Sequence, residues 1–383
     1  MKDNNTSKYK YACELKSDMS DYGKYEQYIN LEEAYHTKDE SDDMAFGLFE
    51  NKESDIRAVP GLTIIAGMTG HGKSMLGNSL AYKAVRNGLN VLYITLEVNK
   101  EDMFYQMLSI ESYIDGSKGE SKAISHSHMK KRSLSPEQEE YLFKELWPSF
   151  KNMEGNLHIL SEFDFDVGDT ASLQSKMMEV EDYSKVHYGR GIDMIIVDYI
   201  QLFKIYSRGS GTGEYSVLTN WVNDFRKLSL NYLGENREIP IIILSQLNRD
   251  AWVDDKQRQK QMAKNNMKVE YVPSGCSNKR VNVPDIVLSI SQIAGCTEIA
   301  KAAKQIIAIY SDESYKASKQ CLVSLLKNRN GGTHMDPAVT YMNPEYYIVG
   351  FLNEYNESYK GDYDSLFEDD IVPISSFEGG SSL

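Results

Sequence analysis

Short apolar runs alternate with segments of helical periodicity along most of the chain. Such runs, bounded by polar residues, are typical of strands buried on both faces of a sheet. The runs that predict strands are Leu62–Ala66, Val91–Leu96, Leu157–Leu160, Met194–Asp198, Ile241–Leu244, Ile286–Ile290, Leu322–Leu326 and Tyr346–Phe351. Between several of them apolar residues recur at helical spacing, as from Val217 to Leu228. The alternation predicts an α/β fold with a twisted, mostly parallel sheet flanked by helices.

The two ends of the chain lack this alternation. Residues 1–56 are polar, and only Tyr22–Tyr35 has the spacing of a short helix; a loosely ordered arm is the alternative interpretation. Residues 353–383 are acidic and end in glycine and serine, which predicts a disordered tail. We therefore expect an N-terminal arm, a core domain over residues 57–352 and a C-terminal tail. Within the core, Thr297–Lys319 has the pattern of an added helical stretch.

A glycine-rich segment follows the first predicted strand. Its sequence, G-x-x-x-x-G-K-[ST], is the P-loop pattern that binds nucleotide phosphates. The glycines permit a tight turn whose backbone N–H groups point at the phosphates. The Lys73 ammonium would reach the β- and γ-phosphates, and the Ser74 hydroxyl would bind Mg²⁺. The predicted site for ATP, or for another NTP or dNTP, comprises Gly67, Met68, Thr69, Gly70, His71, Gly72, Lys73 and Ser74.

Polar residues follow three of the other apolar runs. Asp198 ends the run that begins at Met194, which is the form of a Walker B carboxylate that holds Mg²⁺. Glu97 is a candidate general base if its strand neighbours the P-loop strand; a surface glutamate is the alternative. Gln246 could hydrogen-bond the γ-phosphate or the attacking water, or only nearby backbone. Hydrolysis needs groups of these kinds, so the pattern favours an enzyme over a simple nucleotide-binding module.

Basic residues outside the P-loop are candidates for contacts with phosphate groups. Lys327 and Arg329 stand at i and i+2, so they should point the same way and could act across a subunit boundary as an arginine finger; a basic solvated turn is the alternative. Two polar loops, 204–214 and 249–280, could contact a nucleic-acid backbone or be merely solvated. The residues that we assign to DNA binding are Lys204, Arg208, Arg249, Lys256, Arg258, Lys260 and Lys264.

The net charge bears on these loops once it is located along the chain. The chain has a formal charge of −14, and residues 1–56 and 353–383 carry −7 each. The core is therefore neutral overall, and the acidity of the chain does not exclude a nucleic-acid partner. The four cysteines show no close C-x-x-C pairing, and no apolar run is long enough to span a membrane. The composition predicts a cytoplasmic protein with reduced thiols that does not bind a membrane.

Several motifs carry a resemblance to a known family. Besides the P-loop they are Leu96-Glu97, Val197 to Leu202, Leu244 to Arg249 and Lys327 to Gly331. Their sequences and order resemble the Leu-Glu-Met, Asp-Tyr-Leu-Gln-Leu, Leu-Ser-Gln-Leu-Asn-Arg and Lys-x-Arg-Asn-Gly motifs of the DnaB-family replicative helicases. The resemblance extends from Pro60 to Phe351. It implies a RecA-like P-loop NTPase core that assembles into hexameric rings.

The resemblance also implies roles that the spacing alone leaves open. Glu97 becomes the general base, Gln246 the γ-phosphate sensor, and Lys327 and Arg329 the pair that acts on a neighbouring subunit. The two basic loops become the lining of a channel that tracks single-stranded DNA by its backbone. The implied partners are single-stranded DNA, further copies of the chain, and a primase, loader or other replisome protein that could bind the acidic ends.

We therefore expect an ATP-dependent DNA helicase that translocates on single-stranded DNA and unwinds duplex during replication, in the cytoplasm of a bacterium. The primase-binding N-terminal domain of the family is much longer than the segment that precedes the core here, and a shortened chain of this kind suits a bacteriophage. Two alternatives remain open. One is a RecA-type recombinase, which forms filaments on DNA without processive unwinding. The other is a DNA-binding regulatory ATPase or helicase loader without unwinding activity.

Overall fold

The computed structural model describes residues 56–116, 123–206, 214–235, 237–247, 296–329 and 334–350. Several sequence predictions lie outside these ranges, among them the helix Tyr22–Tyr35, the strand Ile286–Ile290 and the C-terminal tail. In the described ranges the predicted α/β fold is confirmed. No helix in them is long and apolar enough to cross a membrane.

A single mixed sheet forms the centre of the described structure, with its strands in the order β3-β2-β4-β5-β1-β6-β7-β8-β9. Strands β1 to β6 run parallel, and β7, β8 and β9 extend one edge with antiparallel pairing. The carboxyl ends of the parallel strands therefore lie on the same side of the sheet, where ligands bind in sheets of this kind. The strands are β1 (Gly61–Gly67), β2 (Asn90–Thr95), β3 (Asn156–Ser161), β4 (Met194–Asp198), β5 (Pro240–Gln246), β6 (Gln305–Tyr310), β7 (Gln320–Asn328), β8 (His334–Asn343) and β9 (Ile348–Val349).

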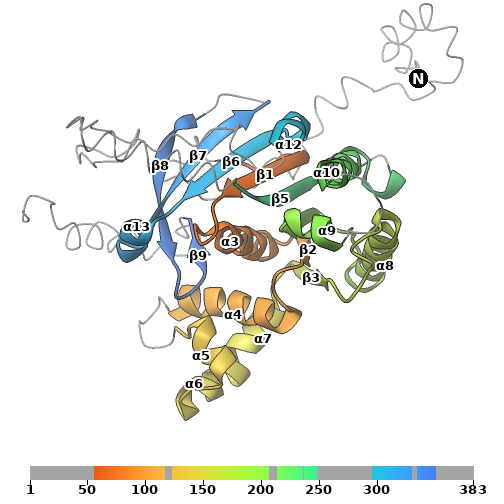
Figure 1. Ribbon diagram of the computed structural model, residues 1–383. Helices are drawn as coiled ribbons and strands as arrows, with labels where there is room; N and C mark the ends of the chain where they lie inside the picture. Colours follow the sequence, from red (N-terminus) through yellow and green to blue (C-terminus); the bar gives the residue numbers. More distant parts are fainter. Residues whose placement is uncertain are drawn as a thin grey trace, which may run out of the picture.

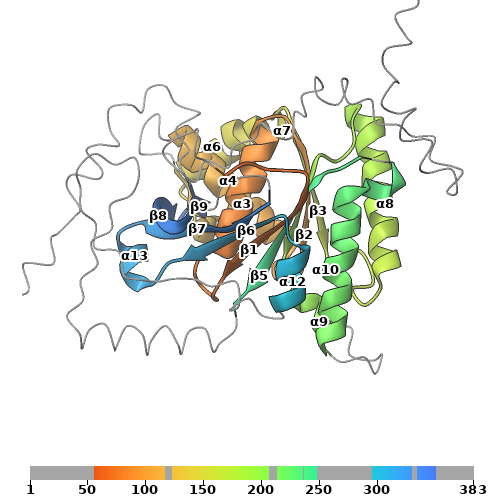
Figure 2. The ribbon, with the colours of Figure 1, turned by 90° about the horizontal axis from the view of Figure 1, so that it is seen from above.

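Helices cover both faces of the sheet, and each face has its own apolar core (Figure 1, Figure 2). The first face carries α3 (Lys73–Arg86), α4 (Lys100–Gly116), α5 (His126–Lys131), α6 (Pro136–Tyr141), the π-helical turn η3 (Leu142–Leu146) and α7 (Trp147–Lys151). The second carries α8 (Thr170–Tyr188), α9 (Gln201–Tyr206), α10 (Glu214–Leu230), the 3-10 turn η4 (Tyr232–Gly234) and α12 (Cys296–Ala302). The short helix α13 (Glu313–Ala317) connects β6 to β7.

Most of the predicted strands are confirmed, because strands with helices on both faces need continuous apolar runs. Every residue of β1, β2 and β4 is buried. The predicted strand Tyr346–Phe351 is largely wrong, since only β9 is extended there. Tyr347 has a φ of 61°, which belongs to a turn and not to a strand. Phe351 lies outside the described ranges.

The prediction of a helical stretch over Thr297–Lys319 is wrong. The segment contains α12 and α13, but between them β6 pairs with β1 on one side and β7 on the other. All of β6 is buried, and its isoleucines favour an extended backbone. Charged residues close on either side, Lys304 and Asp312, break the apolar run and give the segment the spacing of an amphipathic helix. The sequence pattern therefore missed a central strand of the sheet.

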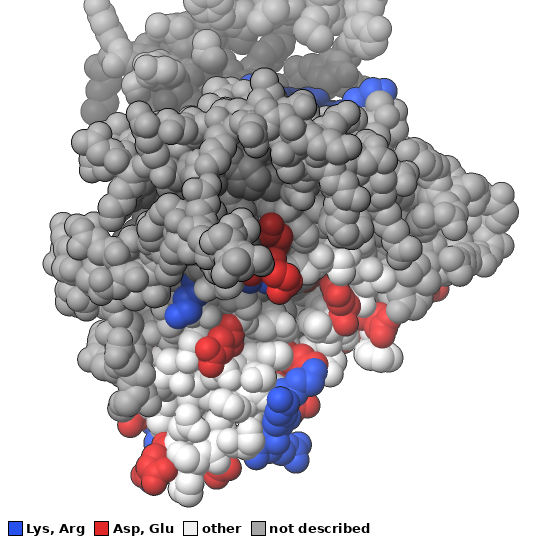
Figure 3. Space-filling model, turned by 60° about the vertical axis from the view of Figure 1, so that its left-hand side comes forward, with Lys and Arg blue, Asp and Glu red and all other residues white. Residues whose placement is uncertain are grey.

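Helices α4 to α7 form a layer below the sheet in Figure 1. Its aromatic side chains pack together: the Trp147 ring stacks on Phe150 and meets Phe104 edge-on. Figure 3 shows this lower part as a mainly uncharged surface with acidic and basic side chains at its margins. Because α4 begins three residues after Glu97, the layer anchors the backbone that carries that carboxylate.

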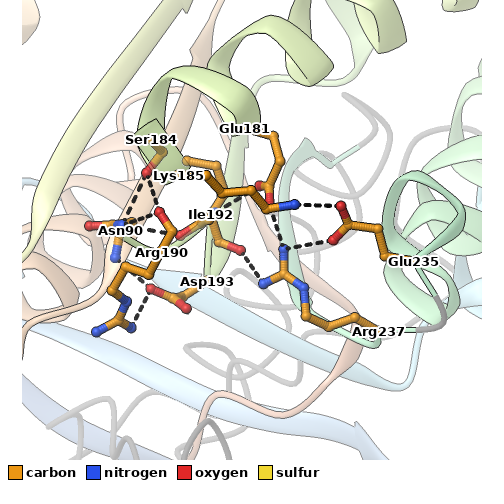
Figure 4. Close-up of polar contacts among 10 residues, drawn as sticks. Asn90, Glu181, Ser184, Lys185, Arg190, Ile192, Asp193, Glu235 and Arg237 are labelled. Carbon is orange, nitrogen blue, oxygen red and sulfur yellow. Dashed lines mark hydrogen bonds and ion pairs between the residues drawn. The ribbon is translucent and has the colours of Figure 1, made fainter. Parts of the chain in front are cut away.

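A buried carboxylate ties α8 to the amino ends of the central strands (Figure 4). Glu181 is 2% exposed and accepts hydrogen bonds from the Ile192 N–H at 2.8 Å and the Arg237 guanidinium at 3.0 Å. The Lys185 ammonium lies 3.2 Å from the same carboxylate. A Cβ at Gly191 would collide with the Glu181 carboxylate, so a larger residue there would displace it. The network fixes the segments that enter β4 and β5, and so sets where both strands end.

We expect Glu181→Ala to lower the free energy of unfolding by about 2–3 kcal/mol, because the Ile192 N–H and the Arg237 guanidinium lose their buried acceptor. The two cations beside Glu181, Lys185 and Arg237, are partly exposed and can regain water. The loss is therefore smaller than for a fully buried pair. Urea denaturation measures the difference. The control is Glu179→Ala, which removes an exposed pair with Lys176 and should leave the free energy of unfolding nearly unchanged. Equal losses for the two variants would contradict the assignment.

Candidate nucleotide-binding site

The P-loop connects β1 to α3 at the carboxyl edge of the sheet. Gly70 and Gly72 have φ values of 78° and 92°, which glycine adopts without steric cost. A Cβ on Gly72 would also lie 3.0 Å from the sulfur of Met342. The N–H of Leu76 bonds the Gly72 carbonyl at 2.8 Å and begins the helix. The remaining N–H groups of the first turn and the positive end of the helix dipole make a site suited to a phosphate.

Two side-chain hydrogen bonds hold the P-loop, one on each side. Toward β5, Gln246 Nε2 donates to the Thr69 hydroxyl at 2.7 Å. Toward β6, His71 Nδ1 accepts the N–H of Ser311 at 3.1 Å, and the His71 ring packs edge-on against Tyr310. The predicted sensor Gln246 therefore contacts the loop directly. His71 must be neutral to accept this bond, which gives a P-loop side chain a structural role that its position in the motif did not indicate.

Lys73, Ser74 and Asp198 converge at the start of α3. The Lys73 ammonium donates to the Met68 carbonyl at 2.9 Å. Burial lowers the pKa of Lys73 to about 8, against the opposing effect of Asp198 and Glu97, so the side chain remains mostly charged at pH 7. Asp198 is 3% exposed, and burial raises its pKa to about 6 although the nearby Ser74 hydroxyl opposes the shift. The P-loop and Walker B residues thus face one another, as their motifs predict.

The residues around Asp198 fit a divalent cation. Asp198 Oδ2 accepts a hydrogen bond from the Tyr93 hydroxyl at 3.2 Å, whereas Oδ1 is buried and has no hydrogen-bond partner among the described residues. A buried carboxylate oxygen left without a donor is costly unless a ligand binds it. Carboxylate and hydroxyl oxygens are the protein ligands that Mg²⁺ prefers. Asp198 and Ser74 therefore remain the candidate Mg²⁺ ligands.

Glu97 lies beyond the end of β2 and is exposed. The condition that the sequence analysis set for Glu97, that β2 neighbours β1, is not met, because β4 and β5 lie between them. The carboxylate is nevertheless near enough to act on the site electrostatically, since it raises the pKa of both Lys73 and Asp198. The carboxyl ends of parallel strands meet at one edge, so a strand farther along the sheet can still deliver a side chain to the P-loop.

Lys327 and Arg329 lie at the amino ends of the parallel strands, whereas the P-loop lies at their carboxyl ends. Asn328 pairs with Gln305, which in turn pairs with Thr63 near the start of β1. The Lys327 ammonium donates to the Ala300 carbonyl at 2.5 Å, and the Arg329 guanidinium to the Lys301 carbonyl at 2.6 Å. Both cations therefore point to the carboxyl end of α12. Neither contacts the P-loop of its own chain.

The predicted DNA-binding residues lie almost entirely outside the described ranges. Lys204 falls in α9, where only the backbone is described. The remaining six stand in stretches that the structure does not describe: Arg208, Arg249, Lys256, Arg258, Lys260 and Lys264. Their assignment to DNA stays a prediction.

Two residues to which the sequence assigned no role hold the site residues in place through hydrogen bonds. Tyr93 is fully buried within β2 and directs its hydroxyl to Asp198. Gln201 donates to the Ser245 hydroxyl at 2.8 Å and accepts the Gln246 N–H at 3.1 Å, and so fixes the end of β5. A single tyrosine inside an aliphatic strand was the available signal for Tyr93. Gln201 belonged to a recognised motif, but its contact with β5 depends on the sheet order.

His71 should make folding sensitive to acid. Burial, with Lys73 and Lys316 adding to its effect, lowers the pKa of His71 to about 4. In the unfolded chain the ring has its usual pKa of about 6.5, so it binds protons there first and stability falls as the pH drops from about 6.5 toward 4. The loss at pH 5 relative to pH 7.5 is at most about 2 kcal/mol.

Melting temperatures measured between pH 7.5 and 4.5 test this expectation. His71→Asn keeps an acceptor for the Ser311 N–H but does not titrate, so its melting temperature should fall less at low pH than that of the unsubstituted protein. Parallel curves for the two proteins would show that His71 does not contribute.

Comparison with known proteins shows which family the sequence matches. The family model described as the DnaB-like helicase C-terminal domain matches residues 58–343. A probable replicative DNA helicase from Trieres chinensis is 25% identical over 193 residues, which are 50% of this chain and 36% of that protein. A structure of a DnaB-like replicative helicase and its interactions with primase has a TM-score of 0.52 at 17% identity and covers 76% of this chain and 57% of its own. A second solved structure, of an isolated ATPase domain, has a TM-score of 0.57 at 16% identity and covers 91% of this chain and 100% of its own.

Proposed function

The chain belongs to the DnaB-like helicase C-terminal domain family, and from this premise we propose that it is an ATP-dependent DNA helicase that translocates on single-stranded DNA and unwinds duplex DNA. The observation that carries the proposal is the convergence of Lys73, Ser74, Asp198 and Glu97 at the carboxyl edge of a RecA-like sheet. A carboxylate beside a P-loop is the kind of group that hydrolysis needs as a general base, which favours an enzyme. The chain spans about a third of the length of the curated relative, so the proposed activity is argued from this site and not from the whole relative.

Each residue of the site has a defined task in hydrolysis. The P-loop N–H groups and Lys73 bind and orient the phosphates of ATP, and Ser74 and Asp198 hold Mg²⁺. When bound, Mg²⁺ neutralises charge that develops on the phosphate oxygens. Glu97 accepts a proton from the attacking water. Gln246, bonded to Thr69, connects the occupancy of the P-loop to β5 and to the loop that follows β5.

We further propose that Lys327 and Arg329 complete the site of a neighbouring subunit in a ring of six. Their distance from the P-loop of the same chain supports a role in trans. The basic loops 204–214 and 249–280 bind the DNA backbone inside the ring. A primase, loader or other replisome protein binds the acidic ends, in the cytoplasm of a bacterium or of a phage-infected host.

Unwinding of a forked DNA duplex in the presence of ATP and Mg²⁺ tests the proposal, with Lys73→Ala as the control. We expect strand separation by the unsubstituted protein alone. Hydrolysis that DNA stimulates, without unwinding, would favour the recombinase. Hydrolysis that DNA does not affect would favour a regulatory ATPase and refute the helicase.

A further inference from the structure

The connection between β6 and β7 forms a second wall beside the P-loop. The Ser311 N–H bonds His71, and Tyr310 packs on the His71 ring with a centroid distance of 4.8 Å. Tyr315 in turn meets the Tyr310 ring edge-on. Asp312 begins α13 by accepting the Tyr315 N–H at 3.0 Å. These contacts fix α13 relative to the loop that binds phosphate.

From this wall Lys316 extends its ammonium toward the tip of the P-loop. A Cβ placed on Gly70 would lie 3.9 Å from Lys316 Nζ, and apart from its chain neighbours it would meet no other described atom within 4 Å. The same ammonium, after burial and Lys73, helps to lower the pKa of His71, the next residue of the loop. The only carboxylate paired with it among the described residues is Glu313, at 2.7 Å.

This placement brings a second ammonium to a region suited to an anion. The P-loop N–H groups, the start of α3 and Lys73 already make the region positive. Glu313 is a weak partner for the Lys316 ammonium, because the Glu313 side chain is 92% exposed. A polyphosphate carries more charge than one carboxylate and would replace Glu313 as the partner.

We propose that Lys316 is a second phosphate-binding cation of the nucleotide site, supplied by the same chain as the P-loop. The proposal rests on the function proposed above, since it needs a nucleotide in that loop. Lys316 exchanges Glu313 for the nucleotide, so Glu313 competes with binding.

Titration of the protein with a fluorescent N-methylanthraniloyl derivative of ATP tests the proposal without measuring turnover. Lys316→Met should weaken binding about tenfold, and Lys316→Arg by less than about twofold. Glu313→Gln should tighten binding a few-fold, because the competing carboxylate is gone. Lys176→Met removes a comparable i,i+3 pair on α8 and should change nothing.

The sign of the Glu313 effect separates the possibilities. If the Lys316–Glu313 pair only stabilises α13, Glu313→Gln will weaken binding or leave it unchanged, and the proposal is wrong. Unchanged binding by Lys316→Met also refutes it. If the unsubstituted protein binds no nucleotide, the proposed function fails first. If Lys316→Met does not fold, the Lys316→Arg and Glu313→Gln measurements decide.

Discussion

Lys73→Ala is expected to reduce ATP hydrolysis by about 10³-fold. Lys73 is the one P-loop side chain with a positive charge, and its ammonium stands where charge develops on the transferred phosphoryl group. The structure adds a second effect: Lys73 also donates to the Met68 carbonyl, so its removal loosens the turn that presents the loop N–H groups. Phosphate release measured at saturating ATP gives the loss in kcat.

Two controls keep this result interpretable. Lys176→Ala removes an exposed lysine of α8 and should hydrolyse ATP normally. The melting temperature of Lys73→Ala should stay close to that of the unsubstituted protein, because α3 keeps its apolar contacts with the sheet. A folded Lys73→Ala variant with more than about a tenth of normal activity would show that this loop is not the hydrolytic site.

Arg329→Ala is expected to lower DNA-stimulated hydrolysis by about 10³-fold or more and to leave nucleotide binding nearly unchanged. The guanidinium is far from the P-loop of its own chain, so its removal should slow hydrolysis in the site of the next subunit. The variant also loses a hydrogen bond to the Lys301 carbonyl, which is exposed and contributes little to stability. Lys327→Ala should show a smaller loss in the same assay.

Mixing two inactive variants makes this prediction decisive. Arg329→Ala retains an intact P-loop, and Lys73→Ala retains an intact Arg329. In a mixed assembly some interfaces combine the intact halves, so hydrolysis should recover to a fraction of the normal rate. No recovery, with assembly of both variants verified by light scattering, would mean that Arg329 acts within its own chain or only in structure.

The sequence predicted the site better than the sheet that holds it. Lys73, Ser74 and Asp198 could be placed from local patterns, since each follows or ends a strand whose burial demands an apolar run. The prediction for Glu97 depended on the strand order, which no local pattern contains, and β2 does not neighbour β1. Glu97 can still reach the P-loop from β2 because the parallel strands all end on the same side of the sheet, and its role as general base stays a prediction.

The failures have a common physical cause. β6 was missed because charged residues on either side disguise a short buried run, and its identity as a strand depends on two partners distant in the sequence. The contacts of His71, Gln201 and Lys316 likewise join segments separated by tens to hundreds of residues. Such contacts depend on the completed fold, whereas periodicity records only which faces are apolar.

Arg329 lies at the amino ends of the parallel strands, opposite the P-loop, and this placement sets how many active centres an assembly can have. If each active centre needs the P-loop of one copy and the far edge of another, the contact is head-to-tail and can never be satisfied mutually by two copies. An open row of subunits then has one active centre fewer than it has members, and a closed ring has as many. The rate per subunit should therefore rise with protein concentration and reach a plateau on closure, so the turnover number itself reports the state of assembly.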